Sequence, residues 1–194
     1  AMTVLMTSVM SGVSIVWDRE FGFLKEVLVS PLSRSGVLVG KAVGAAIIAI
    51  VQGAIMLVLA PIVNVPITLG TVLALLPLLL ILSLSLSGLG LLIGARMRSQ
   101  QGFQIVMQLV IFPMMFLSGI FFPVSGVATW LGVLSKLNPV TYGIDAIRQV
   151  FLGTEVAGVT VFGHTMAIVD SAIVVAMVGA VLLTTAIWVF NRQE

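Results

Sequence analysis

The charged residues of this chain are concentrated in one short stretch between Trp17 and Lys41. It reads WDREFGFLKEVLVSPLSRSGVLVGK and holds seven of the sixteen charged residues in the 194-residue chain. Uncharged, apolar sequence flanks it on both sides. A charged side chain inside a bilayer costs at least ~2.5 kcal/mol, so we expect this stretch to lie in water against a membrane surface. It is therefore predicted to be a docking surface for a partner.

The glycine-rich end of this stretch imitates a phosphate-binding loop but lacks its essential parts. The run Gly36-Val-Leu-Val-Gly40-Lys41-Ala42 is one residue short between the glycines, and it lacks the hydroxyl that would hold Mg²⁺. The full motif G-x-x-x-x-G-K-[ST] occurs nowhere in the sequence. We therefore expect no nucleotide site here.

The other titratable residues do not suggest a catalytic or metal-binding set. The chain has no cysteine, and its one histidine, His164, has no second ligand or nucleophile beside it. Neither paired carboxylates nor a G-x-S-x-G motif is present, so we expect no enzyme activity, catalytic residue or metal site. Asp170 is expected to stabilise the start of the last helix, with a proton site as the alternative. Asp145 and Arg148, spaced i, i+3, are expected to pair.

Composition sets the class of protein that carries these residues. With 60% hydrophobic residues, 8% charged residues and a mean hydropathy of +1.25, the chain cannot be a soluble globular domain. It is predicted to be an all-α, polytopic membrane protein with a single transmembrane domain over residues 1–194. Spans are expected at about 2–17, 42–61, 68–95, 102–122 and 166–190. The first is short for a ~30 Å hydrocarbon core, so we expect it to be a trimmed span of a six-span parent.

Two segments are expected outside the spans, on opposite faces of the membrane. The first is the charged stretch, residues 18–41. The second, residues 123–165, is expected to form short helices broken at prolines, on or partly in the other face, with Trp130 and Tyr142 at headgroup depth. The basic residues divide seven against two between these faces: Arg19, Lys25, Arg34, Lys41, Arg96, Arg98 and Arg192, against Lys136 and Arg148. The positive-inside rule then puts residues 18–41 and the C-terminus in the cytoplasm and the N-terminus outside.

Two sets of motifs resemble one transporter family. The first is Glu20-x-Gly22, Leu28, Ser30-Pro31 and Gly40-Lys41; the second is Ser118-Gly119, Phe122-Pro123, Leu137-Asn138-Pro139-x-Thr141-Tyr142 and Arg148. Their order and spacing resemble those of ABC-2 type transporter permeases (type V exporter-like), in particular the drug-export and nodulation-factor-export branches. The chain departs from that pattern in lacking the first span, and in having Ala128-Thr129 where a proline usually precedes Trp-Leu.

The resemblance implies a permease subunit of an ATP-driven exporter in the bacterial inner membrane. Its partners would be separate ATP-binding subunits, which hold ATP and Mg²⁺, a second permease copy and membrane lipids, but no nucleic acid. The substrate would be amphipathic: a lipid-like compound, a drug, or a glycolipid or polysaccharide. The residues expected to contact the ATPase are Asp18, Arg19, Glu20, Gly22, Lys25, Glu26, Pro31 and Arg34. Those expected in the external re-entrant region are Pro123, Trp130, Asn138, Pro139, Tyr142, Asp145 and Arg148.

Alternatives remain open at two points. A proton-coupled secondary transporter or channel is the second functional class, and it would need ionisable groups at bilayer depth. Gln52, Gln104 and Gln108 are polar side chains within predicted spans. They are expected either to hydrogen-bond between helices or to line a transport pathway.

Overall fold

The computed structural model is a bundle of long helices, described for residues 2–22, 33–63, 67–121, 129–153, 159–161 and 164–192. Four helical segments in these ranges are long and apolar enough to cross a membrane: Ser35–Ile62, Leu69–Arg96, Gln100–Leu117 and Ile168–Asn191. They belong to α4 (Arg34–Leu59, continued by the 3-10 helix Ala60–Val63), α5 (Leu69–Arg96), α6 (Gln100–Leu117) and α9 (Ile168–Asn191). The predicted all-α polytopic class is confirmed.

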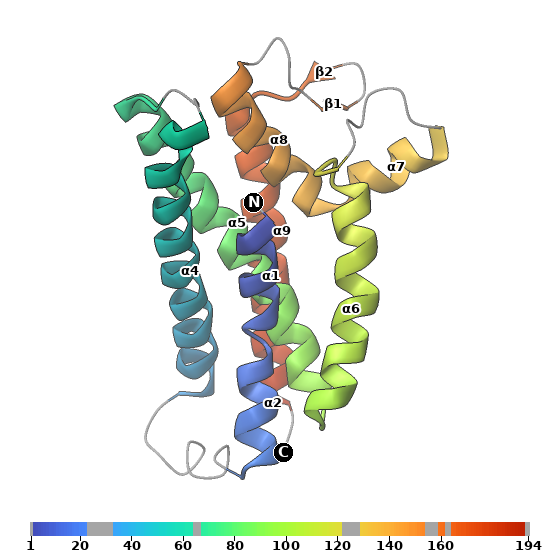
Figure 1. Ribbon diagram of the computed structural model, residues 1–194. Coiled ribbons are helices and arrows are strands. Elements are labelled where there is room, and N and C mark those ends of the chain that lie inside the picture. The colour runs from blue at the N-terminus through green and yellow to red at the C-terminus, as the bar shows by residue number, and fades with distance from the viewer. Residues whose placement is uncertain are drawn as a thin grey trace.

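The predicted span over residues 2–17 takes a different form from the other four. Two short helices, α1 (Met2–Met10) and α2 (Val13–Glu20), follow one another with a break at Ser11 and Gly12. Figure 1 shows them end to end beside α5. Neither is long enough to cross a bilayer by itself, because a span needs about 20 helical residues.

The centre of the bundle is the pair α5 and α9, which contact each other more extensively than any other two elements. Gly179 permits this approach: a Cβ atom there would lie 2.8 Å from the Cα of Ser85, too close for any other residue. A second close approach joins the α1–α2 break to α5, because a Cβ on Gly90 would collide with the backbone of Val9. Gly94 lies similarly close to the backbone of Gly12, so this side of α5 packs against the α1–α2 break.

The peripheral helices α4 and α6 lie on either side of this centre (Figure 1). Thr7 of α1 and Gln52 of α4 hydrogen-bond to each other, with the Gln52 Nε2 3.0 Å from the Thr7 hydroxyl. This is the interhelical bond expected for a glutamine in a span. Below that contact, a groove of about 610 Å³ lies between α1, α2 and α4.

The two ends of the bundle differ in character (Figure 1). At one end, which we call the charged end, α2 and α5 finish, α4 and α6 begin, and α9 reaches Arg192. At the other end lie α7 (Thr129–Leu137), α8 (Pro139–Leu152) and a minimal antiparallel pair, β1 (Thr160–Val161) with β2 (His164–Thr165). His164 lies in β2. At the start of α9, the Asp170 carboxylate accepts a hydrogen bond from the backbone nitrogen of Ala167 (3.1 Å).

Candidate functional site

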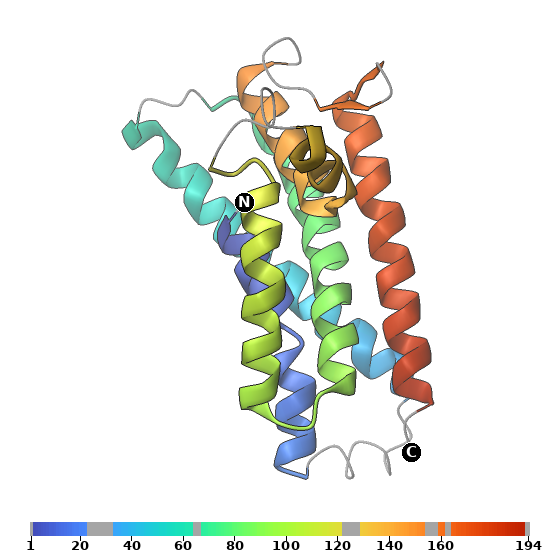
Figure 2. The ribbon, with the colours of Figure 1, turned by 90° about the vertical axis from the view of Figure 1, so that its right-hand side faces the viewer.

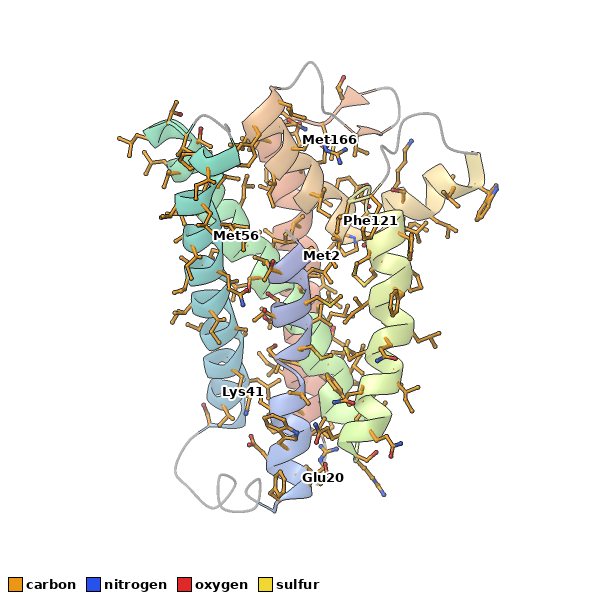
Figure 3. The ribbon with its side chains drawn as sticks, in the orientation of Figure 1. Met2, Glu20, Lys41, Met56, Phe121 and Met166 are labelled. Atoms are coloured by element: carbon orange, nitrogen blue, oxygen red, sulfur yellow. The ribbon has the colours of Figure 1, made fainter. Side chains whose placement is uncertain are left out.

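The last turn of α2 carries three consecutive charged residues, Asp18, Arg19 and Glu20, which we call the charged turn. It lies at the charged end, where Figure 3 labels Glu20 and Lys41. Sequence reasoning assigned these side chains to contacts with a partner. In the structure each of them contacts a different helix of the same chain.

Asp18 contacts α4. Its Oδ2 atom lies 2.7 Å from the Nζ of Lys41, and both side chains are about one-fifth exposed. A salt bridge this close to solvent contributes at most about 1 kcal/mol. The pair therefore orients α2 relative to α4 more than it stabilises the fold.

Arg19 contacts the end of α5. Its Nη1 donates to the carbonyl of Met97 (2.8 Å) and its Nη2 to the carbonyl of Ala95 (2.9 Å). The last carbonyls of a helix have no partner within the helix and carry its partial negative charge, so a forked cation suits them. Burial lowers the pKa of the Arg19 guanidinium, and the positive charge of Arg98 lowers it further. The group stays protonated at physiological pH, because the ordinary arginine pKa is so high.

Glu20 contacts the beginning of α6. Its Oε2 accepts a hydrogen bond from the backbone nitrogen of Gln100, 3.3 Å away. Ser99 caps the same helix by accepting from Gly102. The free N–H groups at a helix start carry partial positive charge, so a carboxylate is favourable there. The charged turn thus joins the beginning of α4, the end of α5 and the beginning of α6.

Beyond the charged turn, the chain presents an apolar side chain that sequence reasoning did not single out. Phe21 exposes 81% of its surface, and Gly22 has a φ of 78°, a conformation that favours glycine. The sequence held a signal for this exposed side chain, since Phe21 directly follows three charged residues. Of the other predicted contact residues, Lys25, Glu26 and Pro31 lie outside the described residues. Arg34 is the first residue of α4, and its side chain lies outside them as well.

At the opposite end, α7 and α8 supply hydrogen bonds to the end of α6. Four side chains take part, which we call the α7–α8 cap. They are Ser135 to the Leu117 carbonyl (2.5 Å), Asn138 to Met114 (2.7 Å), Thr141 to Leu117 (3.3 Å) and Arg148 to Gly119 (2.8 Å). These bonds satisfy carbonyls that the end of a helix leaves without partners. The sequence analysis did not single out Ser135. The available signal was its position three residues before Asn138, near the end of α7.

The remaining predicted residues of this end have varied roles. Pro139 is the first residue of α8, and the Tyr142 hydroxyl donates to the Lys136 carbonyl (2.7 Å). Trp130 is exposed. Pro123 lies outside the described residues.

The expected pairing of Asp145 with Arg148 is wrong for the described structure. Arg148 binds the Gly119 carbonyl, whereas the Asp145 carboxylate accepts from Nε2 of Gln149 (2.7 Å). The Gln149 amide also donates to the Met166 carbonyl (2.9 Å). Because the carbonyls of Gly119 and Met166 attract these donors, the i, i+3 spacing on α8 does not decide the pairing. Asp145 is only 7% exposed.

Comparison with known proteins agrees with the motifs. The ABC-2 type transporter family profile matches residues 1–152. A probable multidrug ABC transporter permease, YbhR of Escherichia coli K12, is 34% identical over 151 residues, covering 77% of this chain and 41% of the relative. The putative transport permease ycf38 of Porphyra purpurea is 27% identical over 148 residues, 75% of this chain and 50% of the relative.

A third relative is a nodulation protein. Nodulation protein J of Rhizobium leguminosarum bv. viciae is 36% identical over 84 residues, which is 43% of this chain and 32% of the relative. The chain spans about half the length, or less, of these curated relatives. Since the family profile covers most of the chain, this protein belongs to the ABC-2 type transporter family of membrane permeases.

Proposed function

We propose that this chain is the membrane-spanning permease subunit of an ATP-driven exporter, powered by separate ATP-binding subunits and working with a second permease copy. The charged turn carries this proposal. Three successive residues bond to three helices, so a displacement of the end of α2 acts on α4, α5 and α6 together. A partner that binds this end would therefore be coupled mechanically to most of the bundle.

The same geometry offers a route to the far end of the bundle. Glu20 bonds to the first residue of α6, and the α7–α8 cap bonds to its last carbonyls. Closure of an ATPase dimer against α2 would then move α6, and α6 would move the α7–α8 cap. The pathway would open at that end.

The charged end is proposed to face the cytoplasm of a bacterial inner membrane. Helix ends at the charged end carry Arg19, Arg96, Arg98 and Arg192, and Lys41 lies within the first turns of α4. Lys136 and Arg148 lie in α7 and α8 at the other end. The positive-inside rule favours this orientation, with the C-terminus of the chain inside.

An amphipathic substrate suits the groove between α1, α2 and α4. Its volume of about 610 Å³ is within the range of small-molecule sites. Met6 and Met10 line it with adaptable apolar side chains, and Thr7, Ser11 and Ser14 add hydroxyl groups. Such a lining accepts varied apolar shapes and still offers hydrogen bonds to a polar group.

The test compares two exposed aromatic residues, one in the last turn of α2 and one just after it. Phe21→Ala removes the apolar side chain beyond the charged turn, and Trp17→Ala removes one of similar size a turn earlier (44% exposed). In membranes containing the chain and a co-purifying ATP-binding subunit, we expect Phe21→Ala to weaken binding of that subunit about 30-fold, as for an aromatic anchor worth about 2 kcal/mol. Stimulated ATP hydrolysis should fall with it, while Trp17→Ala retains both. Equal effects of the two substitutions, or none, would refute this docking site.

One observation favours the alternative of a proton-coupled transporter. Asp145 is a buried carboxyl group whose described hydrogen-bond partner is the neutral amide of Gln149. Transport measured in vesicles without ATP, driven by a proton gradient, would distinguish the two classes. For an ATP-driven exporter we expect no such transport, and Asp145→Asn should leave ATP-driven export in place. Gradient-driven transport that is abolished by Asp145→Asn would establish the alternative.

A further inference from the structure

A buried polar pair lies on α8, at the end of the bundle away from the charged end. Asp145 and Gln149 are four residues apart, so they share one side of the helix, and we call them the α8 polar pair. Only 7% of Asp145 and 2% of Gln149 are exposed. Figure 2 shows α8 beside the start of α9, against which it packs. The Gln149 amide joins the two helices by donating to the backbone carbonyl of Met166, which Figure 3 labels at this end.

The hydrogen bonds of Gln149 fix the orientation of its amide group. The Nε2 atom donates to the Asp145 carboxylate (2.7 Å) and to the Met166 carbonyl (2.9 Å). Both partners are acceptors, so the nitrogen must face them and both of its hydrogens are used. The Oε1 atom of the same amide is buried and has no hydrogen-bond partner. It therefore lies close to the Asp145 carboxylate with its lone pairs unsatisfied.

The start of α9 supplies a further oxygen atom without a partner. Ser171 is fully buried, and its hydroxyl forms no hydrogen bond. Its backbone nitrogen bonds to the carbonyl of Ala167, which places it in the first turn of α9, just beyond Met166. Native proteins leave few buried polar atoms unsatisfied, and those that remain often mark a site that holds water or an ion. The junction of α8 with α9 holds two of them.

The charge at this junction is also unbalanced. Within the described part of the chain Asp145 forms no ion pair. Arg148, three residues further on, instead donates to the Gly119 carbonyl. A buried carboxylate without a positive partner is strongly unfavourable. The junction therefore combines one negative charge with two oxygen atoms that have free lone pairs.

The chemistry of these groups identifies the ligand as a hard cation of single charge. Carboxylate, amide and hydroxyl oxygens are the ligands that hard metal cations take in proteins, with water completing the shell. One carboxylate balances one positive charge, so a monovalent ion leaves the buried site neutral, whereas a divalent ion would leave a net positive charge there.

We propose that the α8 polar pair binds an alkali metal cation, Na⁺ or K⁺, at the start of α9. The Asp145 carboxylate and the Gln149 Oε1 atom are its ligands, and the Ser171 hydroxyl is the third oxygen of the junction. The bound ion would hold α8 against α9 and so steady the α7–α8 cap on α6. This site is independent of the proposed function, because it needs neither ATP nor a partner subunit.

Thermal unfolding of the purified chain in detergent tests the site at constant pH and ionic strength. Tm is compared in sodium, potassium and choline chloride. At an alkali-ion concentration about a hundredfold above its dissociation constant, we expect Tm to lie about 5–10 °C above the value in choline. Equal Tm values in the three salts would overturn the proposal. So would a larger rise with Ca²⁺ than with either alkali ion, or a Tm that responds to pH but not to the alkali ion.

Variants then test the ligand itself. Asp145→Asn keeps the shape of the side chain and removes its charge, so the difference between alkali ion and choline should vanish. Asp170→Asn is the matched control, because Asp170 is an acid at the same end whose described partner is the Ala167 backbone, and it should keep the full difference. Asp145→Glu retains the carboxylate and should keep a difference at higher ion concentration, which tests the site even if Asp145→Asn does not fold. A full difference in Asp145→Asn, or none in Asp145→Glu, would contradict the assignment.

Discussion

Removal of the Arg19 guanidinium is expected to destabilise the protein at the charged end. Arg19→Met retains much of the apolar stem and deletes both hydrogen bonds to the carbonyls of Ala95 and Met97. A hydrogen bond from a charged donor contributes about 1.5–3 kcal/mol, and the partial exposure of this site favours the lower value. Two such bonds give about 3 kcal/mol.

The assay is thermal unfolding of the purified protein in detergent. For a chain of this length, about 3 kcal/mol corresponds to a fall in Tm of about 6–12 °C. Arg19→Lys should lose about half as much, because a single ammonium group lacks the fork that reaches two carbonyls. Arg98→Met is the matched control. Arg98 is exposed, and its positive charge repels that of Arg19, so its removal should leave Tm unchanged or slightly higher. A Tm for Arg19→Met equal to that of the control would refute the reasoning.

Two further predictions concern packing and capping, both measured as changes in Tm. Gly90→Ala should lower the free energy of unfolding by about 3 kcal/mol, because its Cβ would meet the Val9 backbone. Gly40→Ala, which has no atom within 4 Å of its Cβ, should be neutral or stabilising. The reverse order of Tm values would contradict the α1–α5 packing. Asn138→Ala should lower the free energy of unfolding by about 2–3 kcal/mol, since Asn138 both caps α8 at Val140 and donates to the Met114 carbonyl. Asn138→Ser should recover about 1 kcal/mol, because serine can still cap the helix. Equal Tm values for the two variants would argue against the capping role.

The sequence drew attention to the charged turn, but it did not indicate the partners of the side chains there. A charged stretch between long apolar runs is favourable only at the membrane surface, because charges are costly in hydrocarbon. Asp18, Arg19 and Glu20 could therefore be assigned to an end of the bundle. Their partners are backbone groups and side chains about 20 to 80 positions away in sequence. Local spacing holds no information about such contacts, and for the same reason the i, i+3 pairing of Asp145 with Arg148 was wrong.

The sequence alone determined that the chain is a polytopic helical membrane protein. A helix that crosses the hydrocarbon core needs about 20 mostly apolar residues, and such runs can be read directly from the sequence. It also indicated long apolar runs at about 42–61, 68–95, 102–122 and 166–190, because charged side chains are costly inside a span. Only the tertiary structure decided which helix faces touch. It placed Gly90 against Val9, bonded Gln52 to Thr7, and left Gln104 and Gln108 on an open face of α6. All three glutamines look alike in sequence, and the packing of neighbouring helices distinguishes them.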